Sequence, residues 1–491
     1  MTRKLWGLVL AAVAIRAAAA LMAVVIFPDG SRYVRMAQQM GQSRFGEALA
    51  ENTLTHPLYP LLIVLGDAFL HNRILVGALL SAVLGGLAVL PLFFLFRDAW
   101  NDRVAGIAGL FYAFLPVLVE LHSEVMLEGT FMFFFFSTMA LGMSALERRS
   151  WEGAILTGVC AAAAWLTRPE GIYLPLLFGL ACTIRRSRFA PVAFVLFLAT
   201  AFLVAWPYLS FIRAKTGHWG ITANEYSSGV VGLFTGKTAA AGFQVNEQSA
   251  AEYSEYKDIA LYGSIGGPVM TLSKSILKIL YYGLAPFLLL GFWFVRWPGI
   301  RWGPALHLFA GALGYFIPPV LAFVAGTPYS YRYILVPCIL VLPVAAIGLP
   351  KAAEWSRRRE ALPVALAVLC LAMSARLMRF RRADRIGLKQ AGLAIREKLG
   401  EGRRILGWSR PVETYALGEF VDPVTGLTAA DLDRTVREKK VEVLALYLTD
   451  LRFCEKGFLE HVDKSYALFG EFPSPPVKGA TPVRVYVTGL R

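Results

Sequence analysis

The sequence predicts a polytopic α-helical membrane protein with about eleven transmembrane helices and a small C-terminal extracytoplasmic α/β domain. Three observations support this fold class. Hydrophobic residues make up 56% of the 491 residues and charged residues only 17%, and the mean hydropathy is +0.54, too apolar for a single water-soluble core. Uncharged stretches recur at the length that a bilayer requires, about 20 residues. After residue 379 the charges are spread throughout.

Eleven apolar segments account for the predicted spans. The first is Leu5–Phe27, which follows two basic residues as a signal peptide would, but it is too long and is interrupted by Arg16. We therefore expect an uncleaved first helix. Five further stretches are long enough to cross a bilayer: 74–96, 129–146, 189–212, 302–331 and 333–350. Five shorter ones need their flanks: 104–119, 153–167, 171–184, 279–295 and 361–375.

The net charge of +15 indicates topology rather than nucleic-acid binding, because the basic excess lies in short loops between apolar segments. If the N-terminus lies inside, loops rich in Lys and Arg alternate along the chain with loops that contain fewer of these residues. The predicted inside loops are 97–103, 147–150, 185–188, 296–301 and 351–360. The principal predicted outside segments are 28–73, 121–128, 168–170, 213–278, 326–332 and the chain after about residue 378. This alternation requires 53–66, which contains two prolines, to lie on the outer face as an interfacial segment.

The chain divides at about residue 379. Residues 1–379 form the predicted membrane domain, and residues 380–491 form a predicted domain of about 110 residues. Within the second part, "VEVLALYL" (441–448) and "VRVYVTGL" (483–490) have the short apolar runs of strands, and "DLDRTVREKK" (431–440) is predicted to be a helix.

The unusual polar residues fall on the predicted outer side of the membrane. A transporter would be expected to carry ionisable residues near the bilayer midplane, where only Arg16 is found. A site at the outer interface is therefore favoured over a conduction path. The candidate residues are Asp29, Arg32, Tyr33, His56, Tyr59, Glu124, Glu128, Arg168, Glu170 and Arg332.

Each of these residues also has a structural interpretation. Asp29 in "PDGSRYVRMA" suits the start of a helix, and Arg168 and Glu170 in "LTRPEG" suit a salt bridge. Arg332 can reach lipid phosphate with its planar fork or simply extend to the membrane surface. Glu120, Glu124 and Glu128 are spaced at four; on one helix they would share a face and repel unless a cation or arginines lay opposite.

Together these motifs resemble the GT-C superfamily of integral-membrane glycosyltransferases, in particular the group of dolichyl-phosphate-mannose protein mannosyltransferases and aminoarabinose transferases (glycosyltransferase family 39). The resemblance rests on "PDGSRYVRMA", "HPLYPLL", "MLEGTFMFF", "LTRPEG" and "YRYILVP", which occur in this order and on one predicted side over roughly residues 10–350.

The resemblance implies transfer of a sugar, with inversion, from a polyprenyl-phosphate carrier to an acceptor on the extracytoplasmic face of a bacterial inner membrane. Asp29 would be the catalytic base and Glu128 a second acid that orients the acceptor or shares a divalent cation with Asp29. Relatives carry two acids in the first loop, whereas Gly30 and Ser31 follow Asp29 here, so no cofactor is certain and a divalent cation is possible. Arg168 and Arg332 would stabilise the departing lipid phosphate.

The remaining candidates are expected to bind substrate. Tyr33, His56 and Tyr59 would line the site, and so would Arg32, Glu124 and Glu170. The loop 213–278, which includes "GVVGLFTGKTAAAGF", is long enough for a mobile cover or for disorder. The acceptor, whether lipid, glycan or protein, stays open.

Other functions fit the same sequence less well. A ligase of whole oligosaccharides or polymers would need a wider cavity on the outer side. A polyprenyl-linked sugar flippase or transporter would need paired midplane charges and a repeat, neither of which is found. A structural membrane protein with a receptor-like outer domain would tolerate loss of Asp29 and Glu128.

Overall fold

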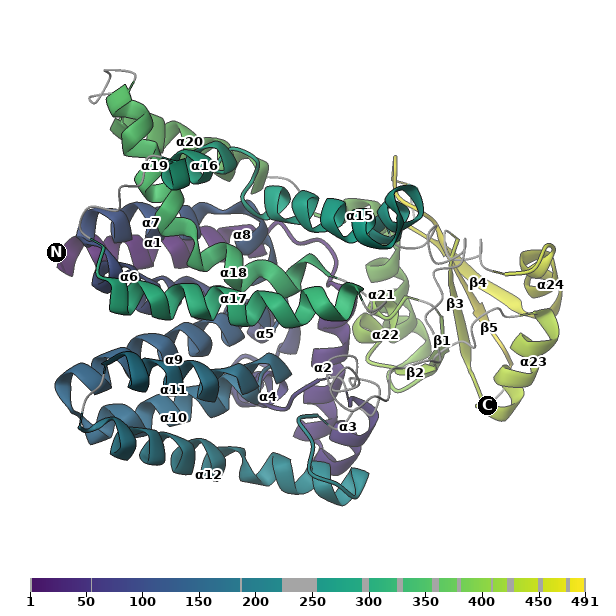
Figure 1. Cartoon of the computed structure of the whole chain (residues 1–491). Helices are drawn as coiled ribbons and strands as arrows, with labels where there is room; N and C mark the ends of the chain where they lie inside the picture. Colours follow the sequence, from purple (N-terminus) through teal and green to yellow (C-terminus); the bar gives the residue numbers. More distant parts are fainter. Residues whose placement is uncertain are drawn as a thin grey trace.

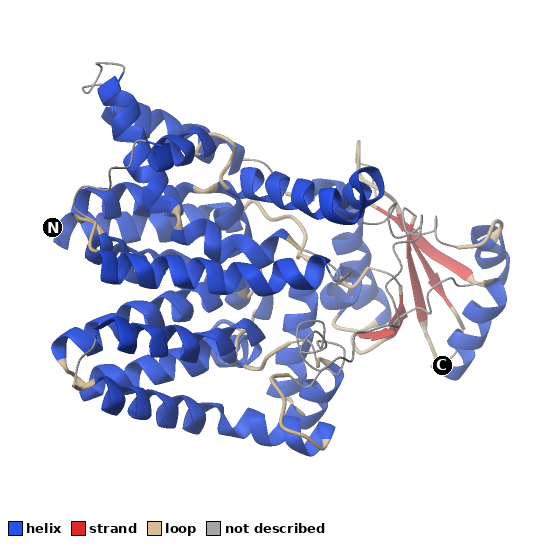
Figure 2. Ribbon diagram, viewed as in Figure 1, coloured by secondary structure: helices blue, strands red, loops and turns tan. Residues whose placement is uncertain are grey.

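The computed structural model is mostly helical, with one small sheet near the C-terminal end of the chain (Figure 2). It describes residues 2–53, 55–185, 188–222, 254–293, 300–324, 330–355, 362–377, 381–407, 409–421, 428–448, 454–473 and 477–489. Of the predicted cover loop 213–278, residues 223–253, which include "GVVGLFTGKTAAAGF", lie outside the described residues, and residues 254–278 belong to the helix α15 (Ser254–Ile279).

The chain up to residue 377 forms a bundle of helices that run roughly side by side (Figure 1). Its first half contains α1 (Thr2–Ala20), α2 (Pro28–Gly41), α3 (Phe45–Glu51), α4 (Leu58–Leu70), α5 (Arg73–Leu87), α6 (Val89–Ala99), α7 (Asp102–Phe114), α8 (Pro116–His122), α9 (Glu128–Arg148) and α10 (Trp151–Trp165). Its second half contains η1 (Pro169–Tyr173), α11 (Leu174–Arg185), α12 (Ala190–Thr216), α15 (Ser254–Ile279), α16 (Ala285–Trp293), α17 (Trp302–Val324), η3 (Tyr331–Ile334), α18 (Leu335–Leu340), α19 (Leu342–Trp355) and α20 (Leu362–Leu377).

The long apolar stretches of the sequence are helices of membrane-spanning length. Among the described residues four helices, α9 and α12 among them, are long and apolar enough to cross a bilayer, and two bent pairs bring the number to six. The α7–α8 pair is bent by 58° and the pair 331–340 with 342–352 by 55°. The segment 53–66, predicted to lie on the outer face, overlaps α4 (Leu58–Leu70), a helix of only 13 residues. Eleven spans stays a prediction.

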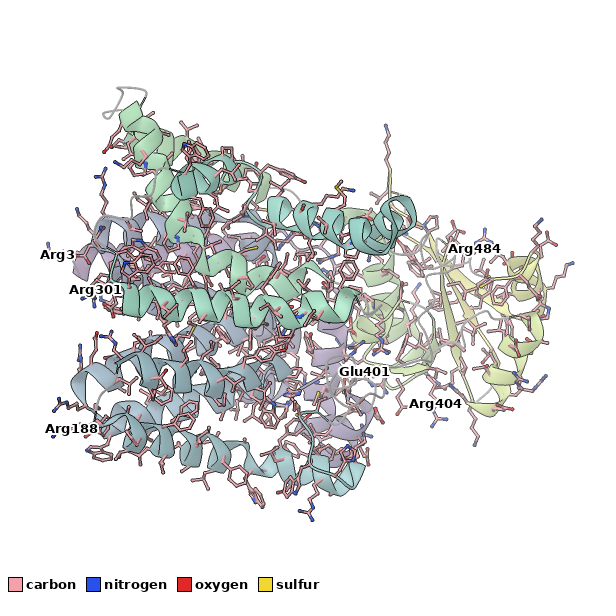
Figure 3. All side chains as sticks on the ribbon, viewed as in Figure 1. Arg3, Arg188, Arg301, Glu401, Arg404 and Arg484 are labelled. Atoms are coloured by element: carbon pink, nitrogen blue, oxygen red, sulfur yellow. The ribbon has the colours of Figure 1, made fainter. Side chains whose placement is uncertain are left out.

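The two ends of the bundle differ. Arg3, near the N-terminus, and Arg188 and Arg301, from two loops predicted to share its side of the membrane, lie at the end of the bundle far from the sheet (Figure 3). The helices α2, α3 and α15 lie toward the sheet (Figure 1). The bundle therefore has one basic end and one end that carries the C-terminal sheet.

Arg16 is fully buried, and its side chain forms hydrogen bonds with groups on both sides of the break between α7 and α8. Its guanidinium donates to the carbonyl oxygens of Tyr112 at 3.2 Å and Ala113 at 3.1 Å and to His122 Nδ1 at 3.2 Å. Pro116 begins α8 and has no N–H to continue the ladder of α7, so carbonyl groups at the end of α7 need another donor. Arg16 supplies it, which explains a charged residue within an apolar helix.

The C-terminal part forms a three-layer α/β unit. It contains η5 (Ala383–Arg385), α21 (Ile386–Leu399), β1 (Arg404–Leu406), α22 (Pro411–Ala416), β2 (Glu419–Val421), α23 (Ala429–Glu438), β3 (Val443–Tyr447), α24 (Phe458–Ser465), β4 (Ala467–Phe472) and β5 (Val483–Val487). The strand order is β2-β1-β3-β5-β4. β1 is parallel to β2 and β3, whereas β5 is antiparallel to β3 and β4.

Both faces of the central strand β3 are covered. Val443 and Ala445 pack with α21 and α22, while Leu444 and Leu446 pack with α23 and α24. This alternation follows from the two-residue period of a strand and explains why the whole segment is apolar. The strands predicted at 441–448 and 483–490 and the helix at 431–440 are confirmed. Val25, which precedes α2, joins the first of these cores, so the unit packs directly against the bundle.

Candidate functional site

Asp29 lies in the first turn of α2. Phe27 is the residue before the helix and Pro28 occupies the first helical position, where its missing N–H costs nothing. The carboxylate of Asp29 suits the positive end of the helix dipole. The stretch does start a helix, which agrees with the structural interpretation of Asp29, and Asp29 is the second residue of that helix, after Pro28.

Gly30 is required by the close approach of α2 to the segment that precedes α9. A Cβ at Gly30 would lie 2.8 Å from the carbonyl oxygen of Val125. This contact gives a structural reason for a glycine at the position after Asp29. It also brings the start of α2 beside the chain that leads to Glu128.

Glu128 is the first residue of α9, and its side chain is almost completely buried. Ser81 on α5 fixes the chain segment just before Glu128. The Ser81 hydroxyl donates to the carbonyl of Met126 and accepts from the N–H of Met126 at 3.3 Å. A Cβ at Gly129 would lie 2.6 Å from the carbonyl oxygen of Ser81. The position of Glu128 thus depends on a tight contact between α5 and α9.

We expect Gly129→Ala to push α9 away from α5 and to reduce both thermal stability and activity, because an added methyl group against backbone costs about 1–3 kcal/mol. The matched control is Gly106→Ala on α7, where nothing lies within 4 Å of the added carbon. That variant should be neutral or slightly more stable. Melting curves in detergent test the pair, and equal curves for the two variants would contradict the packing argument.

Five charged side chains from four elements form one cluster. Arg332 of η3 contacts Asp29 Oδ2 at 2.8 Å and Glu128 Oε1 at 3.2 Å. Arg168, which precedes η1, contacts the same Glu128 oxygen at 3.2 Å and binds both carboxylate oxygens of Glu170, at 2.7 and 3.1 Å. The cluster therefore links residues that the sequence singled out in four separate motifs.

The cluster is shielded from solvent. The side chain of Glu128 is 1% exposed and that of Arg168 is 11% exposed, whereas Asp29 and Arg332 reach 25% and 24%. Glu128 Oε2 is buried and has no hydrogen-bond partner within the described chain. Asp29 and Arg332 thus form the accessible side of the cluster, and Glu128 and Arg168 form its interior.

The Arg168–Glu170 pair stays charged at neutral pH. Burial opposes ionisation of both groups, but their mutual attraction outweighs it. The carboxylate of Glu170 raises the pKa of Arg168 well above its usual value, and the guanidinium of Arg168 lowers the pKa of Glu170. The salt bridge expected for "LTRPEG" is therefore present, within a larger network.

Arg32 has no partner in the described part of the chain. It is half-buried and lies three residues after Asp29, so the two side chains share a side of α2. Arg35 on the same helix instead contacts Glu51 at 3.4 Å and Glu413 at 3.8 Å. Arg32 is thus an uncompensated positive charge beside the accessible acid of the cluster.

The predicted aromatic lining residues are buried in packed positions. Tyr33 and Tyr59 meet edge to face at 5.5 Å, and the Tyr59 hydroxyl bonds to the Gly77 carbonyl oxygen at 2.9 Å. His56 Nδ1 bonds to the carbonyl oxygen of Trp165 at 2.5 Å, and burial lowers the pKa of His56 to about 4. A neutral His56 and Tyr59 brace the helices behind the cluster.

Glu124 does not join the cluster, and the three glutamates do not share one helix face. Glu120 belongs to α8, Glu124 lies in a non-helical segment and Glu128 begins α9. Glu124 is buried and contacts Arg381 at 3.3 Å and Arg382 at 2.5 Å. The condition for a shared face, one helix through all three glutamates, is not met because the helix ends after His122, where Ser123 bonds back to the Glu120 carbonyl.

Sequence reasoning missed Arg381 and Arg382. They stand in "RFRRAD", directly after the last apolar span, where basic residues look like an ordinary membrane-flanking cluster. Nothing in the local pattern signals that their partner lies more than 250 residues earlier in the chain.

A divalent cation shared by Asp29 and Glu128 does not fit this arrangement. The guanidinium of Arg332 bridges the two carboxylates and so takes the position that a shared cation would need. Among the described residues, no group of three or more His, Cys, Asp or Glu side chains is placed to hold a metal ion. A cation at this position would require Arg332 to move away.

Comparisons with known proteins agree with the motifs. Residues 55–211, less than half of the chain, match the family model of dolichyl-phosphate-mannose-protein mannosyltransferase. This range contains Glu128, Arg168 and Glu170. No curated protein sequence matches the chain.

Several solved structures have a similar fold and are remote in sequence. ArnT from Cupriavidus metallidurans in the apo state has a TM-score of 0.62 at 13% identity, with 98% of each chain covered; its structure bound to undecaprenyl phosphate has a TM-score of 0.58 at 14% identity and the same coverage. The Archaeoglobus fulgidus oligosaccharyltransferase in complex with Zn and sulfate has a TM-score of 0.60 at 14% identity and covers 99% of this chain and 73% of its own. The arabinofuranosyltransferase AftD from Mycobacteria has a TM-score of 0.52 at 14% identity and covers 98% and 41%. The resemblance to the GT-C superfamily is confirmed.

Proposed function

We propose that this chain is an inverting glycosyltransferase that moves a sugar from a polyprenyl-phosphate-linked donor to a hydroxyl acceptor on the extracytoplasmic face of a bacterial cytoplasmic membrane. The observation that carries the proposal is the Asp29–Arg332–Glu128 network in a chain with a GT-C fold. Residues 1–379 would form the catalytic membrane domain and residues 380–491 an extracytoplasmic domain.

Asp29 is the proposed base. A bond forms between the acceptor oxygen and the anomeric carbon as the bond from that carbon to the phosphate oxygen breaks. Asp29 takes the proton of the acceptor hydroxyl, and the electron pair of the broken bond stays on the lipid phosphate. Arg332 contacts Asp29 at Oδ2, and the Asp29 side chain is 25% exposed, so the carboxylate can be reached by the acceptor hydroxyl that gives up its proton.

Arg32 and Arg332 are proposed to bind the donor phosphate. A phosphate needs donors that it can reach, and Arg168 is held by two carboxylates in the interior of the cluster, with its side chain only 11% exposed. Arg32 is uncompensated and lies on the same side of α2 as the base, while Arg332 is partly exposed beside Asp29. Arginine at this position stabilises charge as it develops on the leaving phosphate.

Glu128 is proposed to orient the acceptor. Arg168 and Arg332 both donate to Glu128 Oε1. The buried Oε2 is left without a donor in the described part of the chain. A buried acceptor in this state costs about 1–3 kcal/mol, and a hydroxyl group of the acceptor substrate would satisfy it.

The experiment is a donor panel. Purified protein is incubated with polyprenyl-phosphate sugars and with lipid, glycan and peptide acceptors, and release of free polyprenyl phosphate is measured. We expect release from one donor class. Arg32→Gln should raise the KM for that donor by about 10-fold or more, because a hydrogen bond between charged groups is worth about 1.5–3 kcal/mol.

Arg44→Gln is the matched control, because Arg44 lies just after α2, is exposed, and its side chain pairs with Glu47 and Gln42 among the residues that the structure describes. It should leave the KM unchanged. Release of polyprenyl pyrophosphate in place of the monophosphate would favour an oligosaccharide ligase. Absence of release from every donor and acceptor pair would contradict the proposal.

A further inference from the structure

We propose that Arg382 is a positioning residue that fixes the two acids of the site from the C-terminal part of the chain. This inference rests on the proposed function, because it assigns a role in setting the geometry of Asp29 and Glu128. Arg382 does not touch either carboxylate. It contacts the two chain segments that lead to them.

The guanidinium of Arg382 bonds to both segments at once. Nη1 donates to the carbonyl oxygen of Val25 at 2.9 Å, and Nη2 donates to Glu124 Oε2 at 2.5 Å. Val25 lies four residues before Asp29, and Glu124 lies four residues before Glu128. The side chains of Arg382 and Glu124 are 15% and 4% exposed, so water competes little with this ion pair.

The neighbouring groups hold the same two segments. The backbone of Arg381 pairs with the stretch around Ala23, donating to the Met22 carbonyl at 2.9 Å and accepting from the Val24 N–H at 3.2 Å. Its side chain donates to the carbonyl of Glu120 at 3.0 Å. Arg381 and Arg382 therefore connect the chain segment that precedes α2 with the segment that precedes α9.

Tyr415 on α22 adds a further bond to the first segment, because its hydroxyl accepts from the Ile26 N–H at 2.9 Å. Arg382 itself adopts the left-handed conformation, with φ 58° and ψ 32°. A residue other than glycine keeps this conformation only where the surroundings impose it. Here several hydrogen bonds on both sides of Arg382 impose it.

Phe27 connects this junction to the charged cluster. Its ring lies 4.9 Å from the guanidinium carbon of Arg382 and 5.9 Å from that of Arg332. Phe27 is two residues from Asp29, so a shift of the ring moves both members of the Arg332–Asp29 pair. A misplacement of about 1 Å reduces catalysis by about 100-fold, which is the expected scale of the effect.

The experiment compares Arg382→Ala and Arg382→Lys with Arg385→Ala in the full-length protein. Arg385 is three residues away, its side chain is 43% exposed, and within the described part of the chain the ion pair of that side chain is with Asp384 at 4.0 Å. We expect Arg382→Ala to lower kcat by about 100-fold with little change in donor KM. Arg382→Lys should recover part of the loss, because the single ammonium group of lysine can keep the contact to Glu124 but cannot also bond to the carbonyl oxygen of Val25. Arg385→Ala should match the wild type.

A role in folding alone would lower the fraction of protein that binds donor and leave kcat per binding site unchanged, and that result would overturn the inference. Amide hydrogen exchange gives a readout independent of turnover. Arg382→Ala should speed exchange in peptides covering 26–34 and 122–130, and unchanged exchange would also overturn the inference. A wild type inactive on every donor would instead count against the proposed function, while the exchange data still decide whether Arg382 positions these segments.

Discussion

Replacing Asp29 by asparagine is expected to reduce sugar transfer by about 10²- to 10⁴-fold, the usual contribution of a general base. Asparagine has the same size and its oxygen still accepts a hydrogen bond from Arg332, which contacts Asp29 at 2.8 Å. It cannot accept a proton from the acceptor hydroxyl at neutral pH. The loss should therefore fall on kcat, with the melting temperature close to that of the wild type. Release of polyprenyl phosphate under saturating donor measures it.

The matched control for this variant is Asp67→Asn. Asp67 on α4 also forms an ion pair, with Arg73 at 2.9 Å, and is 18% exposed, so it tests the loss of a carboxylate outside the cluster. Its transfer rate should stay within about 2-fold of the wild type, since a partly exposed pair contributes little. Equal rates for Asp29→Asn and the wild type would remove Asp29 from the mechanism and leave it as the first-turn acid of α2.

Removing Arg168 is expected to cause the largest loss of stability. Arg168→Leu leaves Glu128 and Glu170 with fewer partners in a shielded place, where their side chains are 1% and 14% exposed. Breaking a buried pair in this way costs about 3–5 kcal/mol. The unfolding transition in detergent should move to lower temperature and the yield of folded protein should fall.

Two comparisons isolate the cause. Arg44→Leu removes an arginine whose pair with Glu47 is exposed, with side chains 45% and 60% accessible, and should cost at most about 1 kcal/mol. Arg168→Leu combined with Glu170→Leu should recover part of the lost stability. The double variant removes the Glu170 carboxylate, which the loss of Arg168 alone would leave buried without its partner. If the single and double variants melt alike, the stability of this region does not depend on the charge of Glu170.

The charged motifs were predictable because of where they stand. Arg168 and Glu170 lie between two apolar segments with no space for a solvated loop, and Glu128 opens a long apolar helix. Charges at such positions need partners in the folded protein, so their meeting in one cluster could be anticipated. The strand β3 is likewise predictable, because a short run of apolar residues is typical of a strand that is covered on both faces.

Other features depend on contacts between distant parts of the chain. The break between Glu120 and Glu128 interrupts a spacing that suits a helix, and Glu124 leaves the helical face to meet Arg382. Gly30 looks like a departure from a family pattern until the carbonyl of Val125 is found beside it. The break, the contact at Gly30 and the pairing of Arg381 and Arg382 arise from tertiary packing, which overrides local preference and leaves no periodic signal.

The buried Arg16 also has a consequence for the biosynthesis of the protein. Arg16 lies in the last turns of α1 (Thr2–Ala20), and a charged residue at the centre of a membrane helix costs about 2.5–3.5 kcal/mol on insertion, which sets an upper limit for Arg16. The acceptors that satisfy Arg16 on α7 and α8 are the carbonyls of Tyr112 and Ala113 and the ring of His122. These are made roughly 100 residues later during synthesis, which proceeds at about 5–20 residues per second. For several seconds the newly made α1 lacks these acceptors, so we expect the yield of folded protein to depend on how α1 is held until α7 and α8 have been made.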